Sequence, residues 1–147
     1  PMVAAGHSAG GHLAVELALT DPARWGLSAS PIAGVLALSG VYDLAPLIRT
    51  SLDRALRLTA ETARAASPVH RAEAAACPAL FVVGGAETPA FLAQNRAMAA
   101  AWAKAGARAE VVEAAGEDHF SLIARLADPA SDLTGRVVRF LDEVVPA

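Results

Sequence analysis

One short string, Gly6-His7-Ser8-Ala9-Gly10, has the residue types and the spacing of a nucleophilic serine. An apolar run over residues 2–5 precedes it and a helical pattern follows it, which is the strand–turn–helix context that a G-x-S-x-G motif requires. On so sharp a turn, we expect a side chain in place of either flanking glycine to collide with its neighbours. The Ser8 hydroxyl would then stand above a sheet edge, and the Ala9 N–H would point to where an oxyanion forms. A glycine-rich turn that only caps a helix is the alternative interpretation.

A nucleophilic serine needs a general base, and the chain has four histidines. His119 is the candidate, because it lies in a loop directly after the fourth predicted strand, at the carboxyl end of a parallel sheet. His7 and His12 flank Ser8 but cannot easily fold back onto it, so we expect packing or helix-face roles for both. His70 lies in a polar, helix-rich stretch, where we expect it to face solvent.

The base in turn needs an orienting acid, and three carboxylates are candidates. Glu87 is favoured, because it follows the third predicted strand in a loop and gives the chain order serine, acid, histidine. A carboxylate in the first turn of a helix is its other interpretation. Asp43 follows the second predicted strand and remains an alternative acid, although it also suits a helix N-cap. Asp118 is the weakest candidate, since it adjoins His119 and neighbouring side chains rarely reach each other's ring nitrogen.

The elements that must position these residues alternate between short apolar runs and helical patterns. This alternation predicts βαβ units and a mostly parallel sheet of about four strands flanked by helices. The predicted strands cover residues 2–5, 32–38, 80–83 and 109–112. Helices are predicted over residues 10–20, in broken pieces over 43–67, from the Thr88-Pro89 start signal to Gly106, and over 133–145.

Length and composition exclude several classes of protein. The 147 residues suit one domain, and their net charge of −3 with no basic cluster argues against a nucleic-acid partner. The apolar runs fall short of the ~18 residues of a membrane span, and no basic and hydrophobic leader opens the chain. A single cysteine, Cys77, excludes an intrachain disulfide, and the histidines and Cys77 lack metal-ligand spacing. We therefore expect a soluble, cytoplasmic protein without a metal or other cofactor.

Four segments together resemble the kynurenine formamidase (arylformamidase) branch of the α/β-hydrolases: GHSAGGHLA at 6–14, LSGVYDLAPL at 38–47, ASP at 66–68 and GGAETPAF at 84–91. The resemblance implies a three-layer α/β-hydrolase fold with Ser8 as nucleophile, Glu87 as acid and His119 as base. It also implies hydrolysis of N-formyl-L-kynurenine to kynurenine and formate, so that the partner is a small acyl amide or ester. A short-chain carboxylesterase is the first alternative, and a non-catalytic remnant or interaction module is the second.

The resemblance covers only the C-terminal half of that fold. Nothing in the chain matches the His-Gly-Gly oxyanion-hole segment or the first four of the eight strands. Residues 1–147 are therefore expected to form a single partial domain that is weakly active or inactive alone. The run over residues 2–5 would then be an unpaired apolar edge, which favours self-association and leaves a homodimer open.

Overall fold

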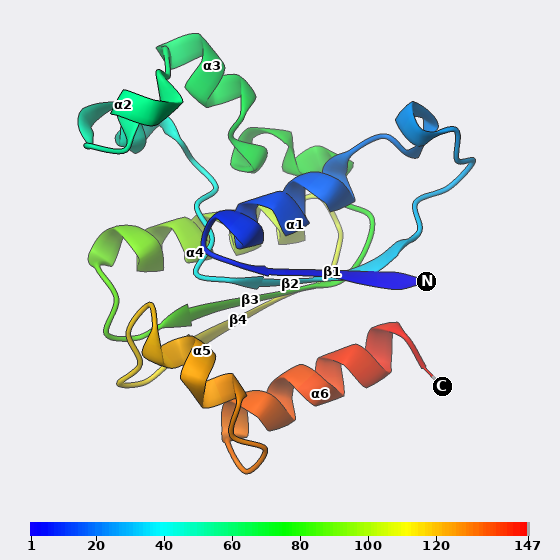
Figure 1. The fold of residues 1–147 in the computed structure, drawn as a ribbon. Coiled ribbons are helices and arrows are strands. Elements are labelled where there is room, and N and C mark those ends of the chain that lie inside the picture. The colour runs from blue at the N-terminus through cyan, green and yellow to red at the C-terminus, as the bar shows by residue number, and fades with distance from the viewer. Residues whose placement is uncertain (147) are drawn as a thin grey trace.

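Four parallel strands form the centre of the computed structural model, which describes residues 1–146 (Figure 1). The sheet order β1-β2-β3-β4 repeats the order of the strands along the chain. The strands are β1 (Met2–His7), β2 (Ile32–Leu38), β3 (Ala79–Gly84) and β4 (Ala109–Ala114). All four lie where the apolar runs predict them, and all but β2 extend beyond the predicted limits.

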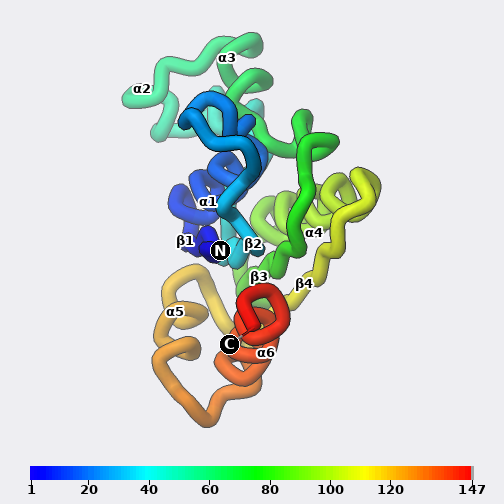
Figure 2. The backbone as a smooth tube through the Cα atoms, turned by 90° about the vertical axis from the view of Figure 1, so that its right-hand side faces the viewer, coloured from blue at the N-terminus to red at the C-terminus, as the bar shows by residue number. Residues whose placement is uncertain are grey.

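Helices cover both faces of this sheet, which makes three layers (Figures 1 and 2). On one face lie α1 (Ala9–Leu19) and α4 (Pro89–Lys104), and on the other lie α5 (Ser121–Leu126) and α6 (Asp132–Val144). A short 3-10 helix, η1 (Pro22–Trp25), follows α1. None of the helices formed by residues 1–146 combines enough length and apolarity to cross a membrane.

The core has two parts because successive strand residues point to opposite faces. Val35 and Ala37 of β2 pack in the cluster under α1 and α4, while Leu36 and Leu38 pack in the cluster under α5 and α6. Every residue of β3 is buried, so this strand is apolar throughout, as a parallel strand covered on both faces should be.

A long excursion, residues 39–78, joins β2 to β3 and stands away from the sheet beyond α1 (Figure 1). It contains two 3-10 helices, η2 (Ala45–Arg49) and η3 (Pro68–Ala74), and two short α-helices, α2 (Asp53–Leu56) and α3 (Ala60–Ala65). The first three of these pieces, η2, α2 and α3, are the broken helical pattern that the sequence predicts for residues 43–67, and η3 lies beyond it.

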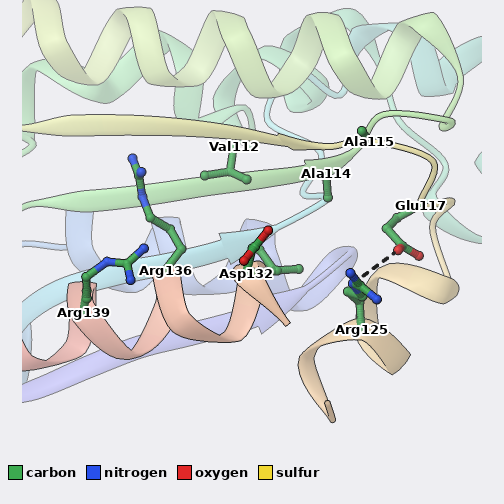
Figure 3. Close-up of a pocket in the computed structure, with 9 residues that line it drawn as sticks. Val112, Ala114, Ala115, Glu117, Arg125, Asp132, Arg136 and Arg139 are labelled. Carbon is green, nitrogen blue, oxygen red and sulfur yellow. Dashed lines mark ion pairs between the residues drawn. The ribbon is translucent and has the colours of Figure 1, made fainter. Parts of the chain in front are cut away.

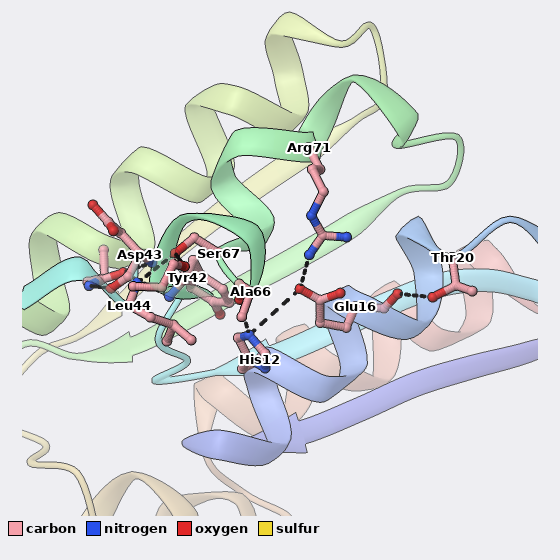
Figure 4. Close-up of polar contacts among 11 residues, drawn as sticks. His12, Glu16, Thr20, Tyr42, Asp43, Leu44, Ala66, Ser67 and Arg71 are labelled. Carbon is pink, nitrogen blue, oxygen red and sulfur yellow. Dashed lines mark hydrogen bonds and ion pairs between the residues drawn. The ribbon is translucent and has the colours of Figure 1, made fainter. Parts of the chain in front are cut away.

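Polar contacts tie the excursion to α1 (Figure 4). The His12 ring is hydrogen-bonded to the Ala66 carbonyl, Nε2 to O, at 2.9 Å, and Arg71 forms an ion pair with Glu16. Within the excursion, the buried Ser67 hydroxyl accepts the Leu44 N–H at 2.8 Å.

A second tie joins the start of the excursion to α4. The side-chain oxygen of Gln94 accepts the backbone N–H groups of Tyr42 and Asp43 at 2.8 and 2.7 Å, and its amide donates to the Asp43 carbonyl. The excursion therefore begins and ends at fixed points beside the sheet.

Candidate active site

Ser8 occupies the turn between β1 and α1 in a backbone conformation that L-residues rarely adopt, with φ of 57° and ψ of −120°. Its N–H donates to the Leu38 carbonyl of β2 at 2.9 Å, so the turn is tied to the neighbouring strand. Its side chain makes no capping hydrogen bond to the helix that follows. The hydroxyl is therefore not engaged as a helix cap, which leaves it available for other chemistry.

The glycines around Ser8 are not equivalent. A Cβ added at Gly6 would lie 2.1 Å from the Gly10 carbonyl oxygen, so only glycine fits there. At Gly10 the expected collision is wrong: a Cβ would meet nothing within 4 Å, because this position faces open space on the first turn of α1. The close approach occurs one residue later, at Gly11, where a Cβ would lie 3.1 Å from the Gly40 Cα.

Ala9 is the first residue of α1. Its N–H belongs to the first-turn donors that have no acceptor within a helix, and it lies at the positive end of the helix dipole. The Ala9 N–H could therefore donate a hydrogen bond to an oxyanion that forms near Ser8.

Glu87 follows β3, and its side chain is only 2% exposed. One oxygen, Oε1, accepts the Gly84 N–H at 2.9 Å and the Ser39 hydroxyl, and the other, Oε2, lies 2.8 Å from Nδ1 of His119. A proton shared between His119 Nδ1 and Glu87 Oε2 leaves Nε2 free to accept another.

The other two acid candidates are engaged elsewhere. Asp43 accepts the Ala45 N–H at 3.0 Å, as a residue that opens a turn does. Asp118 accepts the N–H groups of Ser121 and Phe120, both at 2.8 Å, and these hydrogen bonds lower the pKa of its carboxyl group. The structure thus brings Glu87, and neither aspartate, into contact with the His119 ring.

Ser39 is a site residue that sequence reasoning missed. It directly follows β2, is fully buried, and has a φ of 46°. Its N–H donates to the Val82 carbonyl at 2.7 Å, which fixes the hydroxyl that donates to Glu87. In the sequence, Ser39-Gly40 indicates only the end of a strand, and nothing marks the serine as a partner of a residue 48 positions away.

His119 is surrounded by three rings. Their centroids lie 4.4 Å away for His7, 4.8 Å for Phe91 and 5.5 Å for Phe120. Burial lowers the pKa of His7, and the charge that His119 can carry lowers it further. Two smaller effects raise this pKa: a hydrogen bond with the His119 backbone, and the nearby charge of Glu87.

The four histidines therefore have different roles. His70 is exposed, His12 holds the excursion, and His7 packs against His119. Within residues 1–146, no hydrogen bond joins the Ser8 hydroxyl to the His119 ring. Glu87 contacts His119 directly. His119 in turn contacts His7, which precedes Ser8 in the chain.

Two pockets lie near this edge of the sheet. A pocket of about 260 Å³ is open beside His119 and is lined by Ala86, Glu87, Thr88, Phe91, Asp118, His119 and Phe120. A larger pocket of about 460 Å³ lies between β4, α5 and α6 and contains none of the three candidate catalytic residues (Figure 3). Two of its arginines form ion pairs, Arg125 with Glu117 at 3.7 Å and Arg136 with Glu110 at 2.6 Å.

Among residues 1–146, no three histidine, cysteine or acidic side chains gather in a way that could hold a metal ion.

Comparison with known proteins places this geometry in a family. Residues 1–122 match a family model described as alpha/beta hydrolase fold. The chain is 31% identical over 141 residues to a kynurenine formamidase of Danio rerio, covering 92% of this chain and 48% of the fish protein. A kynurenine formamidase of Salmo salar is 28% identical with the same coverage. The chain thus spans about half the length of these curated relatives.

Solved structures are similar over most of the chain. Esterase 2 of Thermogutta terrifontis superposes with a TM-score of 0.73 at 28% identity, covering 99% of this chain and 57% of the esterase. A crystal structure assigned to a thioesterase of Silicibacter superposes with a TM-score of 0.74 at 40% identity, covering 89% of this chain and 48% of that one. With its family match, its parallel sheet and its helices on both faces, the chain belongs to the alpha/beta hydrolase fold family.

Proposed function

We propose that this chain carries the catalytic groups of a serine hydrolase that cleaves a small acyl amide or ester. Ser8 is the nucleophile, His119 the general base and acid, and Glu87 the residue that orients His119. The observation that carries the proposal is the 2.8 Å contact between a buried Glu87 and His119, beside a turn that holds Ser8 at positive φ.

The proposed reaction has two halves. The Ser8 hydroxyl oxygen attacks the acyl carbonyl carbon while Nε2 of His119 takes the hydroxyl proton, and the Ala9 N–H stabilises the oxyanion. The bond to the leaving amine or alcohol then breaks, and His119 returns its proton to that group. Water attacks the acyl-enzyme by the same route in reverse, giving the free acid and restoring Ser8.

For the substrate, we propose N-formyl-L-kynurenine, cleaved to kynurenine and formate. The support is the similarity to kynurenine formamidases over 92% of the chain, together with the segments shared with that branch. A short-chain carboxylesterase is the second candidate, favoured by the similarity to the Thermogutta esterase over 99% of the chain.

Fluorophosphonate labelling tests the proposed nucleophile. The probe phosphonylates an activated serine, so the protein as encoded should be labelled at Ser8 and become inactive. Ser8→Ala should abolish labelling, while Ser51→Ala, at an exposed serine outside the site, should not change its rate. A folded protein that resists the probe would favour the non-catalytic alternative.

Kinetics distinguish the two substrates. A formamidase should turn over N-formylkynurenine with a higher kcat/KM than p-nitrophenyl acetate. His119→Ala should lower kcat by several orders of magnitude, and Glu87→Gln by less, because Glu87 orients rather than reacts. Rapid cleavage of the acetate ester with no cleavage of the formamide would assign the esterase function instead.

A further inference from the structure

The His7 ring is the nearest of the three aromatic neighbours of His119, and the proposed mechanism gives it no task. We propose that His7 is a positioning residue, whose ring holds the His119 imidazole at the tilt that directs Nε2 towards Ser8. This inference rests on the proposed role of His119 as the base.

The hydrogen bond to Glu87 alone does not fix the orientation of His119. A single contact, Nδ1 to Oε2, holds one edge of the ring and leaves the ring free to tilt about that contact. The opposite nitrogen, which must accept the serine proton, moves most when the ring tilts. A catalytic group must be held to within about 0.5 Å, so contacts on the ring are needed as well, and its nearest rings are His7 and Phe91.

His7 provides such a contact through its ring and not through its Nε2 atom. Its ring lies 4.4 Å from the His119 ring, centroid to centroid, at an angle of 43°. Its Nε2 is buried and has no hydrogen-bond partner among residues 1–146. A buried nitrogen without a partner costs free energy and cannot place His119. The ring of His7 and its hydrogen bond with the His119 backbone are then the two contacts that can, and the variants below separate them.

The position of His7 in the chain explains why it can align base and nucleophile together. It is the last residue of β1, pairs with Leu38 in the sheet, and directly precedes Ser8. The segment that fixes the hydroxyl therefore also fixes the ring against which His119 rests. The distance between the two catalytic groups is then set by one rigid turn.

The charge state of His7 is consistent with this role. The groups that face it are His119 and Glu87, and burial next to His119 lowers the pKa of His7. A neutral His7 does not repel the imidazolium that His119 becomes when it accepts the serine proton.

Labelling of Ser8 by a fluorophosphonate tests the inference through three variants of the protein as encoded. His7→Ala removes the ring and should slow labelling by about 10–100-fold, the scale for misplacing a catalytic group by up to about 1 Å. His7→Phe keeps a flat ring without nitrogens and should stay within about threefold of wild type. His70→Ala, at an exposed histidine, is the matched control and should label at the wild-type rate.

Nuclear magnetic resonance of the His119 ring provides a readout that does not depend on the nucleophile. In wild type and in His7→Phe, the Nδ1 proton shared with Glu87 should be visible and slow to exchange with water, and in His7→Ala it should exchange rapidly. Fast labelling or a protected proton in His7→Ala would overturn the inference, as would a His7→Phe variant that behaves like His7→Ala. If wild type is not labelled at all, the proposed function fails, while the proton signal still decides the role of His7.

Discussion

Replacing Gly6 by alanine should strongly destabilise the protein and replacing Gly10 should not, although both glycines belong to the same five-residue motif. At Gly6 the added Cβ would stand 2.1 Å from the Gly10 carbonyl oxygen and 2.3 Å from the carbonyl carbon, whereas real Cβ contacts stay beyond 3.0 Å. The obstacle is backbone, which cannot rotate away as a side chain can. The turn would have to open by about 1 Å, a change on the scale of the largest overpacking penalties, about 3 kcal/mol or more.

At Gly10 the same substitution adds a methyl group in open space on the first turn of α1. Alanine is favoured over glycine within a helix by about 0.5–1 kcal/mol, so Gly10→Ala should be neutral or stabilising. The two variants should therefore differ by about 4 kcal/mol. For a chain of this size that difference is roughly 10–15 °C in the midpoint of thermal unfolding.

The assay is thermal unfolding followed by far-ultraviolet circular dichroism, with Ser8 labelling measured on the same samples. Gly6→Ala should unfold at the lower temperature and lose labelling, while Gly10→Ala should keep both near wild type. Equal midpoints for the two variants would refute the reasoning, because they would mean that the turn relaxes without cost.

Three further predictions concern stability and the acid. The unfolded chain binds a proton on His7 near pH 6.5 and the folded chain only at lower pH, so the free energy of unfolding should fall as the pH drops through this range. Urea denaturation at pH 7.5 and pH 5 should show a smaller loss in His7→Phe, and equal losses would contradict the lowered pKa. Ser39→Ala removes one hydrogen-bond donor to the buried Glu87 side chain and should slow Ser8 labelling by up to about tenfold, which corresponds to the loss of one hydrogen bond of about 1.4 kcal/mol; an unchanged rate would rule out a role for Ser39. Trp102→Ala empties a fully buried site and leaves the Cys77 carbonyl without its donor, so urea denaturation should show a loss of about 3–5 kcal/mol, and a loss below about 1 kcal/mol would contradict this account.

The two central strands, β2 and β3, could be predicted because parallel strands buried on both faces are short apolar runs between turn residues. The edge strands β1 and β4 are less buried, and their apolar runs are correspondingly shorter than the strands themselves. The start of α4 could be predicted from Thr88-Pro89, a local signal that needs no tertiary context. Helix α5 was not predicted, because six residues are too few to show a helical period. An element could thus be predicted where its own residues carry the signal, as in α4, and not where they are too few to do so, as in α5.

The site was harder to predict because its contacts join residues from different strands. Asp43 and Glu87 both follow strands, and only the folded chain shows that the Glu87 carboxylate reaches His119 while Asp43 closes its own turn. The contact between His7 and His119 joins residues that are 119 − 7 = 112 positions apart, and no spacing in the sequence indicates it. Burial of Ser39 is likewise a property of the folded chain alone.

Because β2 and β3 are neighbours in the sheet as well as in the chain, the position of Glu87 is set by their pairing and does not depend on the length of the excursion. Ser39 leaves the end of β2 and Glu87 leaves the end of β3, and these strands are fixed side by side from Val35↔Ala79 to Leu38↔Val82. The chain between them can be longer or shorter without moving either group, since the entropic cost of closing a loop rises only slowly with its length. Grafting a different segment between residues 44 and 66, inside the two fixed points at Gln94 and His12, is therefore a route to engineer the surface of the protein while leaving its chemical groups in register.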